Sequence, residues 1–329
     1  MKKILRSIAA TFLIGAGSAQ ATETLSVYSY RQPFLVEHLF DQFEAESGVK
    51  IEVLYAKKGL IERLKLEGAK SPADILLSSN SLRLLEAKEA GLTQAIEKKS
   101  IIEKIPSNLR DPEQHWLGLT RRGRVLYANQ NTVPDDALND YMDILESDYR
   151  VCLRPWRHPY NVSLVAYLIE SIGETATENW IKGVQSRLGR KPQGNDRAQI
   201  RAVNAGECDI AIANSYYFGV MKADPKQIVH TKNVRAIFPT LDQKHGTFGF
   251  ISGIALLKST DNVAEAEKLI DFMVSAKAQK IYAKVNHEFP ASAQNLDAGP
   301  DEAKLDSKPM AQVFSKRAVA LDLINRIVN

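Results

Sequence analysis

Two adjacent tyrosines, Tyr216 and Tyr217, are the residues of this sequence whose type and place could do chemistry together. They follow the apolar run 208–213, which is typical of a short buried strand, and the polar residues Asn214 and Ser215. Neighbouring side chains of a regular strand point to opposite faces, so two phenols converge on one point only where the strand has ended. Asn and Ser favour such an end. The pair therefore forms either a site of two phenolic oxygens or an ordinary packed aromatic contact.

A third phenol, that of Tyr160, stands in a corresponding place. Residues 157–161 follow a strand-like run and precede a helical pattern, so we expect them to form a loop at a strand end. A phenol has a pKa near 10 and ionises at neutral pH only with help from a cation. Oxygen ligands suit hard cations such as ferric iron. Three phenolates would balance the charge of Fe(III) and leave positions open for a small anion such as carbonate.

Arginine side chains near the same strand ends could hold such an anion. Arg122 and Arg124 lie near the start of a long predicted strand, and a guanidinium group can bind an oxyanion through two parallel hydrogen bonds. Arg31 and Gln32 follow the first predicted strand, next to Tyr30. From the residues alone, Arg122 and Arg124 are explained equally well as an exposed basic strand end.

Signs of catalysis are weak. The sequence has no G-x-S-x-G, Walker A or G-x-G-x-x-G motif. Its six histidines lack the spacing of metal ligands, and only His158 stands near a candidate residue, Tyr160. A secreted hydrolase would need a nucleophile beside a base, and we find no such pair. We therefore expect a binding protein and not an enzyme.

The N-terminus predicts export. Residues 1–21 combine a basic start, the apolar stretch 8–17 and an A-x-A cleavage motif at 19–21, as in a secretory signal peptide of the Gram-negative type. The apolar stretch is too short to cross a bilayer, and no later run is long enough. We therefore expect a periplasmic mature chain with no membrane-inserted segment.

Charge and length exclude some partners. The chain has 43 Lys+Arg against 39 Asp+Glu, and loss of the three basic residues in 1–21 leaves 40 against 39. A net charge near +1 gives no support for a nucleic acid partner. The remaining length, about 308 residues, predicts two domains, and we expect a monomer.

Two cysteines, Cys152 and Cys208, stand in apolar, strand-like runs. An exported chain could join them in a disulfide, which would link the segment before Tyr160 to the segment before Tyr216. Two buried free thiols are the alternative. Two cysteines without a histidine at ligand spacing do not make a zinc site.

The elements that must position these residues alternate between strand and helix patterns, which predicts α/β units with parallel strands. The first unit has predicted strands at 25–30, 49–55 and 73–77, with helices at 34–47, 60–66 and 82–90. The second has strands at 120–127, 150–153 and 209–213, with helices at 163–172, 175–188 and 199–205. The strand 251–257 and helices at 264–274, 276–285 and 313–327 follow, with a loop at 295–309. Ligands in such folds bind beyond the carboxyl ends of strands.

The sequence resembles the periplasmic ferric-ion-binding proteins, the substrate-binding components of iron(III) ABC importers. The resemblance runs along nearly the whole mature chain and rests on the segments 27–33, 71–77, 118–125, 160–164, 190–197, 206–209 and 214–217. It implies an α/β fold of the two-lobed periplasmic-binding-protein type (type II), with a helix-flanked central mixed sheet in each lobe and a hinge between the lobes. It also implies that Tyr160, Tyr216 and Tyr217 are the iron ligands and that an inner-membrane permease receives the iron.

We expect residues 22–123 and 248–296 to form the N-terminal lobe, and residues 124–247 and 297–329 to form the C-terminal lobe. The first of these lobes departs from the family pattern. Many members place His, or His-Tyr, after the arginine of the first loop, where this chain has Gln32-Pro33. Members with an acidic ligand carry it after the third strand, where this chain has the polar segment 78–80.

The chain therefore resembles the branch in which three tyrosines and a carbonate hold iron. Arg31, Gln32, Arg122 and Arg124 are then expected to contact the anion or to lie just outside the metal ligands, and Tyr30 is a further first-lobe contact to consider. The alternative hypothesis keeps the fold and binds an organic or inorganic anion at the arginines, with the tyrosines as packing.

Overall fold

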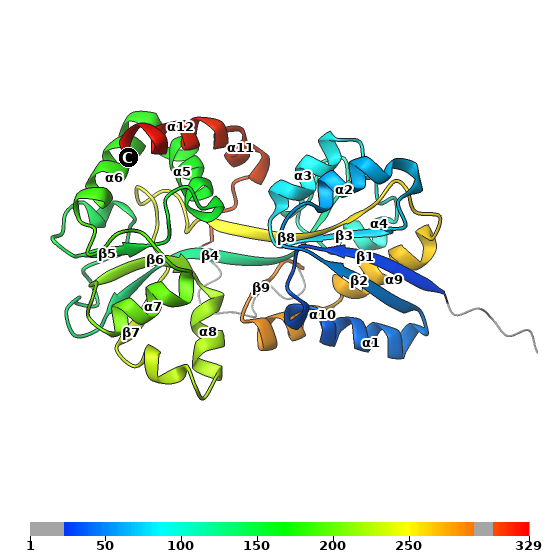
Figure 1. Ribbon diagram of the computed structural model, residues 1–329, viewed down its shortest axis with the longest axis horizontal. Coiled ribbons are helices and arrows are strands. Elements are labelled where there is room, and N and C mark those ends of the chain that lie inside the picture. Colours follow the sequence, from blue (N-terminus) through cyan, green and yellow to red (C-terminus); the bar gives the residue numbers. More distant parts are fainter. Residues whose placement is uncertain (1–22, 293–304, 329) are drawn as a thin grey trace, which may run out of the picture.

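The computed structural model describes residues 23–292 and 305–328 as two lobes side by side (Figure 1). A single path of hydrogen-bonded strands runs through both lobes in the order β2-β1-β3-β8-β4-β6-β5. The predicted signal peptide 1–21 and the predicted boundary at 296–297 lie outside the described residues. Most of the predicted loop 295–309 lies outside them as well.

The first lobe contains a mixed sheet, as predicted. The strands β1 (Thr24–Ser29), β2 (Lys50–Tyr55) and β3 (Ile75–Ser78) are parallel, and β8 (Gly249–Leu256) pairs with β3 in the opposite direction. All four residues of β3 are buried, in keeping with its continuous apolar run. The helices of this part are α1 (Glu37–Ser47), α2 (Leu60–Glu67), α3 (Ser81–Glu89), α4 (Lys99–Ile102), α9 (Val263–Met273) and α10 (Ala276–Ile281).

The long strand β4 (Leu117–Asn129) belongs to both sheets. Up to Gly123 it pairs with β8, and from Arg124 onward it pairs with β6 (Ile210–Asn214). A Cβ atom on Gly123 would come within 3.1 Å of the Phe238 ring and 3.2 Å of the Leu305 side chain. The change of partner therefore takes place at a residue where a side chain would be crowded. The predicted lobe boundary at 123–124 stays a prediction.

The second lobe is built on β6, with β5 (Val151–Leu153) parallel to it and β4 antiparallel. The strand β7 (Val234–Ile237) pairs with the far end of β4. The short β9 (Phe289–Pro290) pairs with the first half of β4 and so belongs to the sheet of the first lobe. The helices of this part are α5 (Pro159–Ile172), α6 (Glu174–Ser186), α7 (Asp196–Asn204), α8 (Tyr216–Ala223), α11 (Met310–Ser315) and α12 (Arg317–Ile327).

Several helices differ from the pattern that the sequence predicts. The helix α5 begins at Pro159 and not at 163, and α4 and α8 were not predicted. Three others change their winding or are divided. The predicted helix 34–47 begins as a 3-10 turn at Pro33–Leu35 and becomes α-helical only at Glu37. The predicted helix 276–285 changes to a π-helix after Ile281, and the predicted helix 313–327 is divided at Lys316. Apolar periodicity marks which face is buried, and a short local change of winding leaves that pattern almost unaltered.

Cys152 of β5 forms a disulfide with Cys208, two residues before β6, and their Cα atoms lie 5.8 Å apart. The predicted disulfide is therefore confirmed, and the free-thiol alternative is wrong. Among the helices that the structure describes, none has the length and apolar character to cross a bilayer.

Candidate metal site

Tyr216 and Tyr217 form the first turn of α8, directly after β6 ends at Asn214. Their ring centroids lie 4.0 Å apart, and the ring planes differ by 31°. The chain thus changes from strand to helix within one residue, Ser215. This change brings two side chains together that a continuing strand would have pointed to opposite faces.

Tyr160 lies in the first turn of α5, whereas the sequence placed it in a loop. Pro159 opens the helix, and the imidazole Nδ1 of His158 accepts a hydrogen bond of 3.2 Å from the backbone N–H of Tyr160. Proline suits the first helical position because its missing N–H has no partner there. The Tyr160 ring also contacts Phe250, with centroids 5.0 Å apart, so it faces the strand β8 that leads to the other lobe.

The three phenols are close enough to affect one another electrostatically. Burial raises the pKa of Tyr216 well above its usual value, and Tyr160 and Tyr217 raise it further. Burial, with Tyr160 and Asp196, raises the pKa of Tyr217 to about 12. Without a metal, Tyr216 and Tyr217 therefore hold their protons at neutral pH, and a cation must displace those protons to bind.

Arg122 is buried between the tyrosines and the first lobe. Its Nη atoms donate to the Ser252 hydroxyl and the Ser79 carbonyl, and Nη1 lies 3.3 Å from Oε1 of Glu288. The Cζ atom of Arg122 is 5.7 Å from the centroid of the Tyr216 ring. Arg122 thus places a positive charge beside Tyr216 while its hydrogen bonds go to first-lobe elements and to Glu288.

The hydrogen bonds of Arg124 go to residues of the second lobe, unlike those of Arg122. Arg124 donates to Oδ1 of Asp196 at 3.0 Å, to Oδ1 of Asn214 at 3.1 Å and to Oδ1 of Asn161 at 2.6 Å. Its Cζ lies 5.9 Å from the Tyr160 ring centroid. Arg122 and Arg124 are both almost fully buried, so the alternative of an exposed basic strand end is wrong.

The remaining predicted site residues, Arg31, Gln32 and Tyr30, belong to the first lobe. Arg31 is buried and pairs with Glu288 at 2.7 Å, while Gln32 is exposed. The hydroxyl of Tyr30 accepts a hydrogen bond from the Ile61 N–H at 2.9 Å. The anion-contact role of Arg31, Gln32, Arg122 and Arg124 stays a prediction, as does a ligand role for Tyr30.

A family model described as bacterial extracellular solute-binding protein matches residues 70–311. The chain belongs to this family. Iron uptake protein A1 of Synechocystis is 38% identical over 276 residues, which cover 82% of this chain and 76% of that protein. The major ferric iron-binding protein of Neisseria meningitidis is 27% identical over 289 residues, which cover 84% of this chain and 85% of that protein. The predicted resemblance is thereby confirmed. The expectation of a protein that is not an enzyme is confirmed as well, because both relatives are named for binding or uptake.

Solved structures of ferric-binding proteins have the same two-lobed fold, so the predicted fold class is confirmed. Apo ferric ion-binding protein A of Pasteurella haemolytica matches with a TM-score of 0.85 and 37% identity over 93% of this chain and 98% of that one. The Trichodesmium protein (IdiA, FutA), solved with iron and citrate, matches with a TM-score of 0.84 and 36% identity over 93% of this chain and 99% of that one.

This family member carries two buried carboxylates beside its tyrosines that the sequence did not reveal. Glu288 lies between Arg31 and Arg122, and Asp196 lies between Arg124 and Arg154, with the Arg154 pair at 3.2 Å. Burial alone would raise the pKa of Glu288, but the charges of Arg31 and Arg122 outweigh that effect and lower it. Asp196 follows Asn195, an N-cap residue whose type is readable from sequence, whereas no local pattern marks Glu288.

A cavity of about 340 Å³ extends from Tyr160 to the first lobe. Its second-lobe wall includes His158, whose pKa is lowered to about 4 by burial and then by the charges of Arg154 and Arg124. His158 is therefore neutral at pH 7. The facing first-lobe wall is polar and includes Tyr30, Gln32, Lys57, Asn80 and Arg83.

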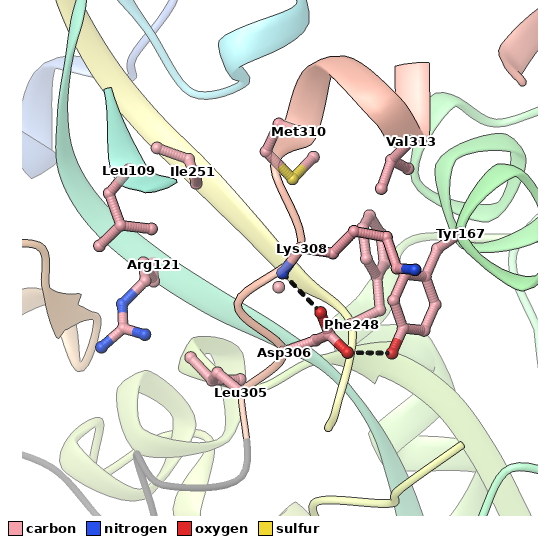
Figure 2. Close-up of a pocket in the computed structure, with 11 residues that line it drawn as sticks. Leu109, Arg121, Tyr167, Phe248, Ile251, Leu305, Asp306, Lys308, Met310 and Val313 are labelled. Atoms are coloured by element: carbon pink, nitrogen blue, oxygen red, sulfur yellow. Dashed lines mark hydrogen bonds between the residues drawn. The ribbon is translucent and has the colours of Figure 1, made fainter. Parts of the chain in front are cut away.

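A second cavity lies against the strands β4 and β8, and none of the three tyrosines lines it (Figure 2). Its volume is only about 10 Å³, which is room for about one water molecule. Asp306 accepts hydrogen bonds there from the Tyr167 hydroxyl at 2.9 Å and from the Lys308 N–H at 2.6 Å (Figure 2). The bond from Tyr167 joins the C-terminal segment to α5, and the cavity is too small for a ligand.

Within residues 23–292 and 305–328, no group of three or more His, Cys, Asp or Glu side chains could hold a metal ion. The phenols of Tyr160, Tyr216 and Tyr217 lie outside that set of residue types, and the fold brings them close together.

Proposed function

We propose that this protein binds ferric iron in the bacterial periplasm and delivers it to an inner-membrane ABC permease. The observation that carries the proposal is the meeting of Tyr160, Tyr216 and Tyr217 in the first turns of two helices of one lobe. The Synechocystis relative is named as an iron uptake protein, and the Pasteurella structure is of a ferric ion-binding protein. Both names fit the chemistry of a phenol-rich site.

Phenolates are hard oxygen ligands, and three of them carry the charge that a ferric ion needs for neutrality. The ion supplies the electrostatic help that ionisation requires, since Tyr216 and Tyr217 have raised pKa values while the site holds no cation. We therefore propose that Tyr160, Tyr216 and Tyr217 ligate the iron and release their protons when it binds.

The charges around the phenols support a companion anion, carbonate or another small oxyanion. Four arginines and two carboxylates form two groups, Arg31–Glu288–Arg122 and Arg124–Asp196–Arg154, in which all but the half-buried Arg154 are buried. An excess of two positive charges remains among these six residues. Among the described residues, Nη1 of Arg31 and Nε of Arg122 have no hydrogen-bond partner. A bound dianion would balance that excess and use such donors.

We further propose that residues 1–21 direct export and that the mature chain acts as a monomer. The lobes are proposed to be 22–123 with 248–296, and 124–247 with 297–329. The change of β4 from β8 to β6 at Gly123 supports the first of these boundaries.

A colour test separates this proposal from the alternative of a protein that binds only an anion. Ferric phenolates absorb visible light by ligand-to-metal charge transfer, so the purified protein should become coloured when ferric citrate is added. Tyr216→Phe and Tyr160→Phe should weaken or shift the band. Tyr167→Phe is the matched control, because Tyr167 lies on the same helix as Tyr160 but its hydroxyl bonds to Asp306 and Gly246. A colourless wild-type protein, together with an unaffected Tyr216→Phe variant, would refute the proposal.

A further inference from the structure

Glu288 is the buried carboxylate of the first-lobe side of the site. It lies just before β9, and its side chain is 1% exposed. One of its oxygens, Oε2, accepts from Arg31 at 2.7 Å and from the Thr120 hydroxyl at 2.9 Å, while Oε1 lies 3.3 Å from Arg122. Both oxygens are therefore engaged, and the carboxylate links Arg31 and Thr120 to Arg122.

Arg122 is held from several directions. Besides Glu288, its guanidinium group contacts the Ser252 hydroxyl of β8 and the Ser79 carbonyl that follows β3. Both Nη atoms are thus engaged while Nε has no partner, and the centroid of the Tyr216 ring lies 5.7 Å from Cζ. Because an arginine side chain has many rotamers, a cation stays beside one ring only if such contacts restrict it.

The next arginine on the same face of β4 shows the contrast. Arg124 contacts Asp196, Asn161 and Asn214, which belong to the same lobe as the tyrosines. Arg122 instead reaches Tyr216 while bound to Glu288, Ser252 and Ser79. Its place beside Tyr216 therefore depends on partners that do not belong to the tyrosine-bearing helices α5 and α8.

We propose that Glu288 is a positioning residue of the iron site, which holds the charge of Arg122 beside Tyr216 and so supports the phenolate that binds iron. The inference rests on the proposed function. Glu288 makes no contact with the metal in this arrangement and acts through Arg122. A cation fixed beside a phenolate stabilises that anion, whereas a cation that moves into solvent does so far less.

A positioning role and a simple charge effect of Glu288 predict opposite changes in iron affinity when Glu288 is removed. If Glu288 acted only as a negative charge, its removal would make the surroundings of Tyr216 more positive and strengthen binding of iron with its anion. If Glu288 positions Arg122, its removal frees the guanidinium group and weakens binding. The variants Glu288→Gln and Arg122→Gln should then act on one interaction, so that their effects are not additive.

The test measures ferric affinity at one pH by competition with a chelator for the wild type, Glu288→Gln, Arg122→Gln and the double variant. We expect each single variant to bind about tenfold more weakly, and the double variant to stay within about threefold of Arg122→Gln. The charge-transfer band should shift in the same direction in all three variants. Thermal unfolding of the iron-free proteins should show the same non-additivity.

Two further variants keep the test decisive. Asp111→Asn removes another buried carboxylate, which pairs with Lys88 at 2.9 Å and contacts none of the tyrosines; it should lower the unfolding temperature but leave the band and the affinity unchanged. Ser252→Ala removes a different partner of Arg122 and should weaken iron binding even if Glu288→Gln does not fold.

Tighter binding by Glu288→Gln, multiplied losses in the double variant, or an unchanged affinity in Ser252→Ala would overturn the proposal. A failure of the proposed function looks different, because the wild-type protein itself would then form no coloured complex.

Discussion

Acidification should release iron, and the slope of the logarithm of apparent ferric affinity against pH should equal the number of tyrosines that lose a proton. The perturbation is a change of pH combined with Tyr160→Phe. Each phenol that must lose its proton makes the apparent ferric affinity fall tenfold for each pH unit below its pKa. Three phenols therefore give a fall of about a thousandfold per pH unit, and the Tyr160→Phe variant should show about a hundredfold.

The size of the proton competition follows from burial. The pKa of Tyr217 is raised to about 12, so a pH of 7.5 lies about 4.5 units below that pKa. At 1.36 kcal/mol per unit, ionising this one side chain costs about 6 kcal/mol, which the bound cation must supply. The pKa of Tyr216 is also raised well above its usual value, so its ionisation adds a further cost. The direction is fixed: because the iron-free form holds the protons, a lower pH favours that form.

The assay is a competition titration between pH 6 and 8 against a chelator of known proton and iron constants, at a constant total concentration of bicarbonate. Any proton that the companion anion releases on binding adds equally to the slopes of the wild type and of Tyr160→Phe, so it cancels in the difference between them. Tyr167→Phe should retain the wild-type slope, since its hydroxyl bonds away from the tyrosine cluster. A wild-type slope below one proton, or the same slope in Tyr160→Phe, would refute the reasoning.

Two structural predictions concern how the tyrosine-bearing strands and helices are supported. A Cβ atom on Gly219 would lie 2.5 Å from Cγ and 2.7 Å from Cβ of His287, so Gly219→Ala should cost about 1–3 kcal/mol in thermal unfolding and weaken iron binding by moving α8. His287→Gly should restore both, since His287 has a φ of 53° that glycine adopts freely, and a lack of rescue would contradict the explanation. Replacement of Cys152 and Cys208, 56 residues apart, by serine should lower the free energy of unfolding by about 4 kcal/mol in urea titrations, and an unchanged midpoint would show that the link does not stabilise the fold.

Much of the fold could be predicted because burial leaves a clear pattern in the sequence. The strand β3 is apolar up to its last residue, Ser78, and buried on both faces, and the strand–helix alternation around it indicated the α/β class. The shorter elements could not be predicted in this way. The strand β9 has only two residues, and β7 contains the charged Arg235 and is mostly half-buried, so neither leaves a clear apolar pattern; both pair with β4.

The candidate site was predictable to the extent that its residues are local in the chain. Tyr216 and Tyr217 are neighbours, and the end of an apolar strand before them is visible in the sequence. The prediction that Tyr160 lies near them came from the family resemblance and from the corresponding positions of the residues at two strand ends. Glu288 is 166 residues from Arg122, and no spacing rule connects them.

The sequence by itself thus determined the residue types and most of the elements that carry the chemistry: two phenols directly after a strand, a third in the segment between a strand and a helix, and two arginines near the start of a long strand. It did so because periodicity and turn chemistry act over a few residues. Only the tertiary structure decided how the charges are arranged, with Arg122 bound to Glu288 and Arg124 bound to Asp196. Each buried arginine needs a partner, and the partner can come from any part of the chain that the fold brings within a few ångströms.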